Sequence, residues 1–270
     1  MKNNKISVFL KGLIVGGTMT VPGVSGGSMA MILGIYERLI SSISSFFKQI
    51  KENSIFLGIF LMGSFLGMFL FANGLLSLME AYPMPVRYFF IGAVAGGIPM
   101  IFREANVKKA TWKSIGYLIL GIIIVSLIAL LPNGLFSVNN SGFLGILLQI
   151  IGGFVIAVAL VLPGISVSQM LLMLGLYEEV ITAIGTLNIL GILPLGIGVV
   201  AGILLTTKLL ENAMKNYPQA TYLIVLGFIL GSLSELFPGF TGDVTQFISV
   251  ITSVIGFFVV YMISKPEAKR

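Results

Sequence analysis

Small polar residues follow a proline in the segment VPGVSGGS, which occupies residues 21–28 within a long apolar run. Proline and glycine interrupt a helix there, and Ser25 stands where it caps the helix that follows. The N–H groups of Gly26, Gly27 and Ser28 would then lack intrahelical acceptors and lie at the positive end of the helix dipole. A helix start of this kind binds anions such as phosphate. The segment therefore predicts either an anion site or a plain interhelical turn with an ordinary cap.

A second break at residues 162–169 has the same character. Residues 163–181 match residues 22–40 at proline, glycine, serine, tyrosine and glutamate positions, with an offset of 141. Further along the chain the offset becomes 135, and glycines spaced four apart recur in both copies, which is typical of helix packing. Two matching breaks favour a functional site over a plain turn. The second set of expected phosphate donors is Ser166, Ser168 and Gln169.

The composition is that of an all-α integral membrane protein. Of the 270 residues, 57% are hydrophobic and only 10% are charged, whereas about a quarter of a soluble domain is charged. The chain has neither cysteine nor histidine, which excludes disulfides, imidazole catalysis and most transition-metal sites. The net charge of +6 is attributed to cytoplasmic loops and not to nucleic-acid binding. No catalytic residue, metal site or cofactor is predicted.

The apolar segments predict two inverted-topology repeats, at residues 1–135 and 136–270. Each repeat is expected to hold one re-entrant, broken-helix hairpin and three transmembrane helices, because most runs reach the ~20 residues that a bilayer requires. An odd number of crossings inverts the second copy. Two full crossings in place of each hairpin would leave the sidedness unchanged, so charge does not separate these alternatives. The expected elements are the hairpin 7–46 with spans 54–78, 84–102 and 115–132, and the hairpin 143–187 with spans 189–207, 220–237 and 245–263.

Lysine and arginine placement predicts the orientation. Most of the 16 basic residues fall in the two termini and in the loops 47–53, 103–114 and 208–219. Cytoplasmic loops are enriched in such residues. We therefore expect a multi-pass protein of the bacterial cytoplasmic membrane with both termini in the cytoplasm.

Acidic residues recur behind a tyrosine in both copies. A continuous helix of about 18 Å would separate the first cap from Glu37. Glu37 and Arg38 are therefore expected near the cytoplasmic interface, and Glu178 near the outer one. The two glutamates serve as gates, proton carriers or an entry point for the head group, or they are solvated at helix ends, where Arg38 would snorkel.

Two further charged residues are expected towards the outer side. Arg87 follows the prolines that separate two spans, where it either binds a phosphate or pairs with Glu80. Glu235 lies near the outer end of its span and either carries a proton or is solvated.

The segment KGLIVGGTMTVPGVSGGSMAMILGIYERLI, with its echo LPGISVSQMLLMLGLYEEVI, resembles the bacterial undecaprenyl-phosphate (polyprenyl-phosphate) translocase family of the PopT type. The likeness covers nearly the whole chain. Two departures from the family pattern stand out. Thr18, Met19 and Thr20 precede the first proline, where the family often has an acidic or amide residue, and Val167 replaces a glycine. The second departure predicts unequal sites, with the first copy closer to the phosphate.

The resemblance implies return of undecaprenyl phosphate from the outer to the inner leaflet, which recycles the lipid carrier of cell-wall synthesis. We expect alternating access around a midplane phosphate site, with Arg87 and Arg38 guarding the outer and inner approaches. A proton gradient, a sodium gradient or consumption of carrier inside the cell would drive transport. The alternative is an ion-coupled secondary transporter of a small soluble anion. The expected partners are polyprenyl phosphate and membrane lipids but not nucleic acid. The sequence allows an oligomer and does not determine the oligomeric state.

Overall fold

The computed structural model describes residues 4–21, 23–107, 111–135, 142–186, 188 and 190–264, and all regular structure in these residues is helical. The first half holds α1 (Lys5–Thr18), α2 (Gly26–Ile32), α3 (Tyr36–Ser44), the 3-10 turn η1 (Phe46–Lys48), α4 (Ile50–Ala81), α5 (Pro83–Glu104) and α6 (Trp112–Ala129). The second half holds α7 (Phe143–Val161), α8 (Val167–Leu174), α9 (Tyr177–Gly185), α10 (Leu193–Asn216), α11 (Pro218–Leu236) and α12 (Val244–Ile263).

Seven of the described helices are long and apolar enough to cross a membrane: α4, α5, α6, α7, α10, α11 and α12. The chain is therefore a multi-pass membrane protein. Six of these helices overlap the six predicted spans. The largest extensions beyond the predicted ends are those of α4, which covers residues 50–81, and of α10, which continues to Asn216. The predicted loop 208–219 is thus mostly helical, since hydropathy reports the apolar window and not where a helix ends.

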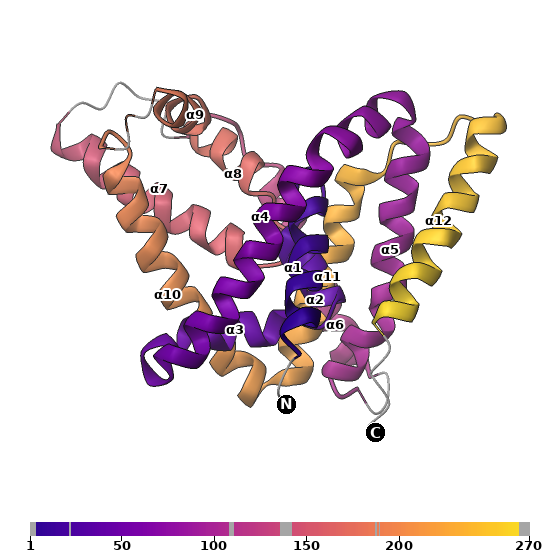
Figure 1. Cartoon of the computed structure of the whole chain (residues 1–270), viewed down its shortest axis with the longest axis horizontal. Coiled ribbons are helices and arrows are strands. Elements are labelled where there is room, and N and C mark those ends of the chain that lie inside the picture. The colour runs from indigo at the N-terminus through magenta and orange to yellow at the C-terminus, as the bar shows by residue number, and fades with distance from the viewer. Residues whose placement is uncertain are drawn as a thin grey trace.

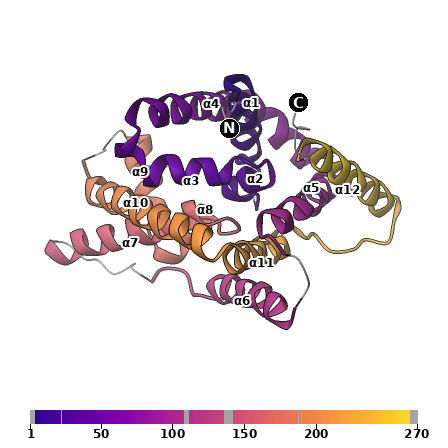
Figure 2. The same ribbon diagram turned by 90° about the horizontal axis from the view of Figure 1, so that it is seen from below.

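Four helix pairs surround a centre of short helices. The pairs are α1 with α4, α7 with α10, α5 with α12 and α6 with α11. Seen from below in Figure 2, α2, α3 and α8 lie inside this ring. The pairs α5 with α12 and α6 with α11 each join one helix from the first half of the chain to one from the second half.

Glycines allow the paired backbones to touch. A Cβ atom on Gly92 of α5 would lie 1.9 Å from the carbonyl oxygen of Ser253 on α12. In return, a Cβ on Gly256 would lie 2.1 Å from the carbonyl oxygen of Phe89. Such small residues are the usual contacts between helices in a bilayer. The predicted role of the spaced glycines in packing is therefore confirmed at this pair.

Replacing Gly92 with alanine is expected to destabilise the protein by about 1–3 kcal/mol, the usual cost of overpacking a tight contact. The new methyl group would meet the backbone of Ser253, which cannot rotate away. The thermal unfolding midpoint in detergent should fall. Gly116→Ala on α6 is the control, because nothing lies within 4 Å of a Cβ there. Equal midpoints for the two variants would contradict this account of the pair.

A second chain break follows each proline motif, and the predicted continuous helix to Glu37 is wrong. Gly34 adopts a left-handed φ of +66°, and α2 ends before it. The N–H of Ile35 donates to the carbonyl of Ala30 (3.0 Å), and the N–H of Gly34 donates to that of Met31 (3.0 Å). This pair of bonds is the Schellman motif that ends helices at glycine.

The second copy repeats the turn at Gly175, where φ is +73°. The N–H of Leu176 donates to the carbonyl of Leu171 at 2.9 Å. The helices after the proline breaks are therefore only seven and eight residues long, about 10–12 Å. In Figure 1, α3 runs across the lower end of the molecule and α9 lies at the upper end.

Candidate functional site

The first break leaves backbone donors without acceptors. Ser25 occupies the N-cap position of α2 with φ −81° and ψ 129°, but its side chain makes no capping hydrogen bond, so the expected cap is absent. The N–H groups of Gly26, Gly27 and Ser28 have no acceptor among the described residues. Pro22 lies outside the described residues. The amides of this short helix start are thus available to a ligand.

The second break does have a side-chain cap. The Ser166 hydroxyl accepts a hydrogen bond from the N–H of Gln169 at 3.4 Å. Ser168 is exposed, whereas Gln169 is half-buried. Gly164 has φ +83°, and a Cβ there would lie 2.5 Å from the backbone carbonyl of Phe228. Only glycine fits this turn, which holds the second break against α11.

The two breaks meet. A Cβ on Gly27 would lie 3.2 Å from the Cα of Pro163. The Tyr36 hydroxyl donates to the carbonyl of Val161 at 2.6 Å, just before the second break. The first break also contacts α11, because a Cβ on Gly23 would lie 3.0 Å from the Leu236 side chain. The two motifs, although distant in sequence, therefore form one centre.

Glu235 joins this centre. Ser166, Gln169 and Glu235 line one pocket, together with Gly164 and apolar side chains of α6 and α8. Glu235 makes no ion pair within the described part of the chain. The sequence predicted only that Glu235 lies near the outer end of its span. The pocket therefore combines hydrogen-bond donors with one carboxylate, an arrangement suited to a ligand that arrives with a proton or a cation.

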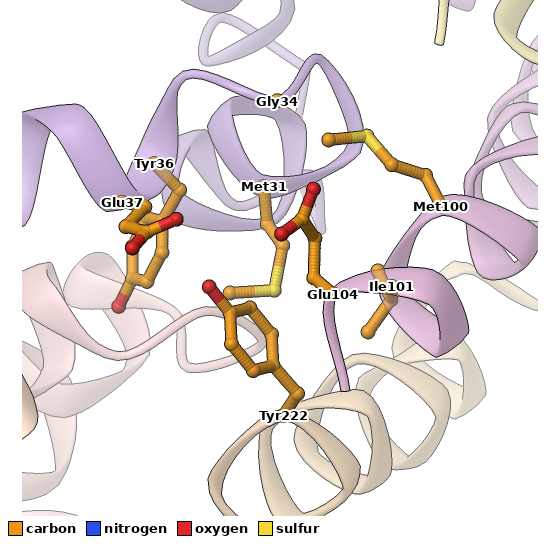
Figure 3. Close-up of a pocket in the computed structure, with 8 residues that line it drawn as sticks. All are labelled: Met31, Gly34, Tyr36, Glu37, Met100, Ile101, Glu104 and Tyr222. Atoms are coloured by element: carbon orange, nitrogen blue, oxygen red, sulfur yellow. The ribbon is translucent and has the colours of Figure 1, made fainter. Parts of the chain in front are cut away.

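A separate pocket lies at the start of α3. Figure 3 shows that the Glu37 and Glu104 carboxylates and the Tyr222 hydroxyl are turned towards the same space. Sequence reasoning missed Glu104 and Tyr222. Their helices, α5 and α11, pack against each other, but no spacing in the sequence links the two residues to Glu37. Paired carboxylates favour protons or cations over phosphate.

The other predicted charged residues lie away from the breaks. The Arg38 guanidinium stands over the ring of Phe56, 5.3 Å from its centroid. Arg87 is half-buried on the first turns of α5, and the pairing with Glu80 is not formed. Neither arginine lines a pocket with the breaks in the described residues.

Glu178 is exposed on α9. It lines an open pocket whose other polar members are Glu179, Thr182, Thr186 and Asn188. The Glu179 carboxylate accepts a hydrogen bond from the Gln149 side chain of α7. The structure therefore places Glu178 at the same end of the molecule as the start of α10, apart from Glu37.

Comparison with known proteins shows that the chain matches a described family. Residues 15–254 match the model of the VCA0040-like family, described as undecaprenyl phosphate translocase-like. A polyprenyl-phosphate transporter of Staphylococcus aureus is 34% identical over 97% of this chain and 96% of its own length. A polyprenyl-phosphate transporter of Vibrio cholerae is 30% identical over 87% of this chain and 78% of its own. No solved structure matches the chain.

The match covers both breaks, the contact of Gly27 with Pro163 and the pocket at Glu235. The relatives are named as transporters and not as enzymes, which agrees with the absence of predicted catalytic residues. The resemblance predicted from the proline motifs is thus confirmed, and the chain belongs to the undecaprenyl phosphate translocase-like family.

Proposed function

We propose that the protein returns undecaprenyl phosphate from the outer to the inner leaflet of the bacterial cytoplasmic membrane. The names of its relatives support the substrate class. The contact between Gly27 and Pro163 is the observation that carries the proposal, because it brings two sets of polar groups at helix starts to one centre. A phosphate head requires such donors at mid-depth, while its prenyl tail stays in lipid.

Inverted repeats account for the helix pairs. The pair α1 and α4 corresponds to α7 and α10, and the pair α5 and α12 corresponds to α11 and α6. In Figure 1, α1 rises from the lower end of the molecule, whereas α7 descends from the upper end. We assign α1–α3 and α7–α9 to two re-entrant hairpins that enter from opposite sides. The repeats are those at residues 1–135 and 136–270.

The lower end of the molecule in Figure 1 is assigned to the cytoplasm. The start of α1 and the end of α12 lie there together, and the positive-inside rule places the basic ends of the chain in the cytoplasm. The outer leaflet then faces α9 and the start of α10.

The phosphate is assigned to the amides and hydroxyls around the two breaks. The donors are Ser25, Gly26, Gly27, Ser28, Ser166, Ser168 and Gln169. Arg38 and Arg87 are assigned to the inner and outer approaches. Glu37, Glu178 and Glu235 act as gates or carry the coupling ion, a proton or sodium. The centre is exposed in turn to the outer and to the inner side, and this moves the head group between leaflets.

The test is reconstitution in liposomes with labelled polyprenyl phosphate on one leaflet. Leaflet exchange should exceed that of protein-free vesicles. The competing function is transport of a small soluble anion through the same helix starts. Uptake of such an anion, with lipid exchange no faster than in protein-free vesicles, would replace the proposed function.

A further inference from the structure

The two repeats differ most at their tyrosine helices. Tyr36 of α3 is 4% exposed and Ile40 is 3% exposed. At the matching positions of α9, Tyr177 is 37% exposed and Ile181 is 52% exposed. The same sequence motif is therefore packed in one copy and open in the other.

The packed copy lies against a helix of the second half of the chain. α3 lies against α10, and α9 makes no comparable contact with the matching helix α4 among the described residues. Ser44 of α3 hydrogen-bonds the Glu211 carboxylate of α10, and Lys215 pairs with the same carboxylate. Leu210 and Met214 of α10 are buried in the same apolar cluster as Ile40. Under the proposed sidedness, this contact lies at the cytoplasmic end.

One hydrogen bond links this contact to the substrate centre. The Tyr36 hydroxyl donates to the carbonyl of Val161, two residues before Pro163. The matching donor, the Tyr177 hydroxyl, has no acceptor among the described residues. The matching acceptor is the carbonyl of Thr20, two residues before Pro22, and no donor reaches it among the described residues.

We propose that Tyr36 and Tyr177 are the two positions of one switch. In the state seen here, Tyr36 holds α3 closed over the inner side of the centre. In the opposite state, α9 packs on α4 and Tyr177 donates to the Thr20 carbonyl, while the bond from Tyr36 breaks. This inference rests on the proposed function for its sidedness and names the gates of that same site.

The outer gate, formed by α9 and α4, lacks the polar contact that joins α3 to α10. The positions that match Ser44 and Glu211 are Gly185 and Leu76. Closure of α9 on α4 would therefore lack the hydrogen bond that joins α3 to α10. This difference favours the state with the outer side open, which is the state that receives lipid from the outer leaflet.

Disulfide trapping tests the switch, because the chain has no native cysteine. Leu76→Cys with Gly185→Cys reports outer closure, and nothing lies within 4 Å of a Cβ at Gly185. Ser44→Cys with Glu211→Cys reports inner closure. A disulfide forms only where the two Cβ atoms approach to about 4 Å. The rate of oxidative cross-linking therefore follows the population of each closed state.

The variants Tyr36→Phe and Tyr177→Phe then serve as controls for each other in this cross-linking experiment. Tyr36→Phe should speed cross-linking of the outer pair about two- to tenfold, the worth of one net hydrogen bond. Tyr177→Phe should slow it by a similar factor. Both variants keep the ring and its packing, and Tyr177→Phe removes no hydrogen bond that is present in this structure. Shifts in the same direction, or no cross-linking of the outer pair in any variant, would overturn the switch.

The cross-linking experiment tests the switch separately from the proposed substrate. Opposite shifts in cross-linking, in a protein that exchanges no polyprenyl phosphate, would retain the switch and refute the substrate. If the protein exchanges polyprenyl phosphate but neither tyrosine substitution changes the cross-linking rates, the substrate is retained and the switch is refuted.

Discussion

Gly27→Val is expected to reduce exchange of polyprenyl phosphate to the rate of protein-free vesicles. Gly27 is the point where the first break meets the second, and even a Cβ would lie 3.2 Å from the Cα of Pro163 and 3.4 Å from its nitrogen. The two further methyl groups of valine have no room against a backbone. They would separate the helix starts whose amides are assigned to the phosphate.

The control is Gly58→Val on α4, where nothing lies within 4 Å of a Cβ. Both variants place valine in a helix, so the intrinsic helix-propensity cost is similar. The measurements are lipid exchange in liposomes and the yield of monodisperse protein in detergent. Full exchange by folded Gly27→Val protein would move the phosphate site away from the contact of the two breaks.

Sequence patterns predicted the breaks because proline and glycine act locally. Gly26 and Gly27 begin a helix, as expected, since the backbone requirement is set by neighbouring residues. The second turn at Gly34 also had a local signal, a glycine at the end of an apolar run before a polar segment. It was missed because the expected helix was extended by its apolar periodicity, although glycine in the left-handed region ends helices.

The partners of each helix could not be predicted in this way. Hydropathy shows that a helix lies in lipid, but not which neighbour it packs against. The pairing of α5 with α12 and of α6 with α11 depends on glycine faces that meet only after the chain is folded. For the same reason, the sequence predicted that Glu235 lies near the end of its span but not that Ser166 and Gln169 are its neighbours. The sequence does not predict that Glu104 and Tyr222 lie near Glu37, because the three residues belong to three separate helices.

The two breaks share their backbone turns but differ in the helix that follows. Both copies share a left-handed glycine at the break, Gly23 with φ +85° and Gly164 with φ +83°, and a Schellman turn at the end of the short helix. The difference lies in the next helix, where Tyr36 and Ile40 of α3 are buried and the matching Tyr177 and Ile181 of α9 are exposed. The proposed alternating exposure of one phosphate site would require the centre to stay fixed while α3 and α9 move.

Ser166→Asp is expected to lower polyprenyl-phosphate exchange by at least about 100-fold while the protein keeps its stability. Aspartate is as good an N-cap as serine, so α8 should start normally. The chain already contains this arrangement, because Asp243 caps α12 by accepting a hydrogen bond from the N–H of Gln246 at 3.1 Å. Ser166 and Gln169 have the same spacing.

The added charge, not a folding defect, should cause the loss. Hydrogen bonds from the Thr241 hydroxyl and the Gln246 N–H lower the pKa of Asp243. At position 166 the N–H of Gln169 would act in the same direction, and the Glu235 carboxylate in the same pocket would oppose it. Two like charges about 4 Å apart repel by about 4 kcal/mol at the effective dielectric of a protein surface. Ser166→Asn keeps the cap without the charge and should retain most of the exchange. Equal exchange by the Asp and Asn variants, at equal melting temperatures, would show that no anion approaches Ser166.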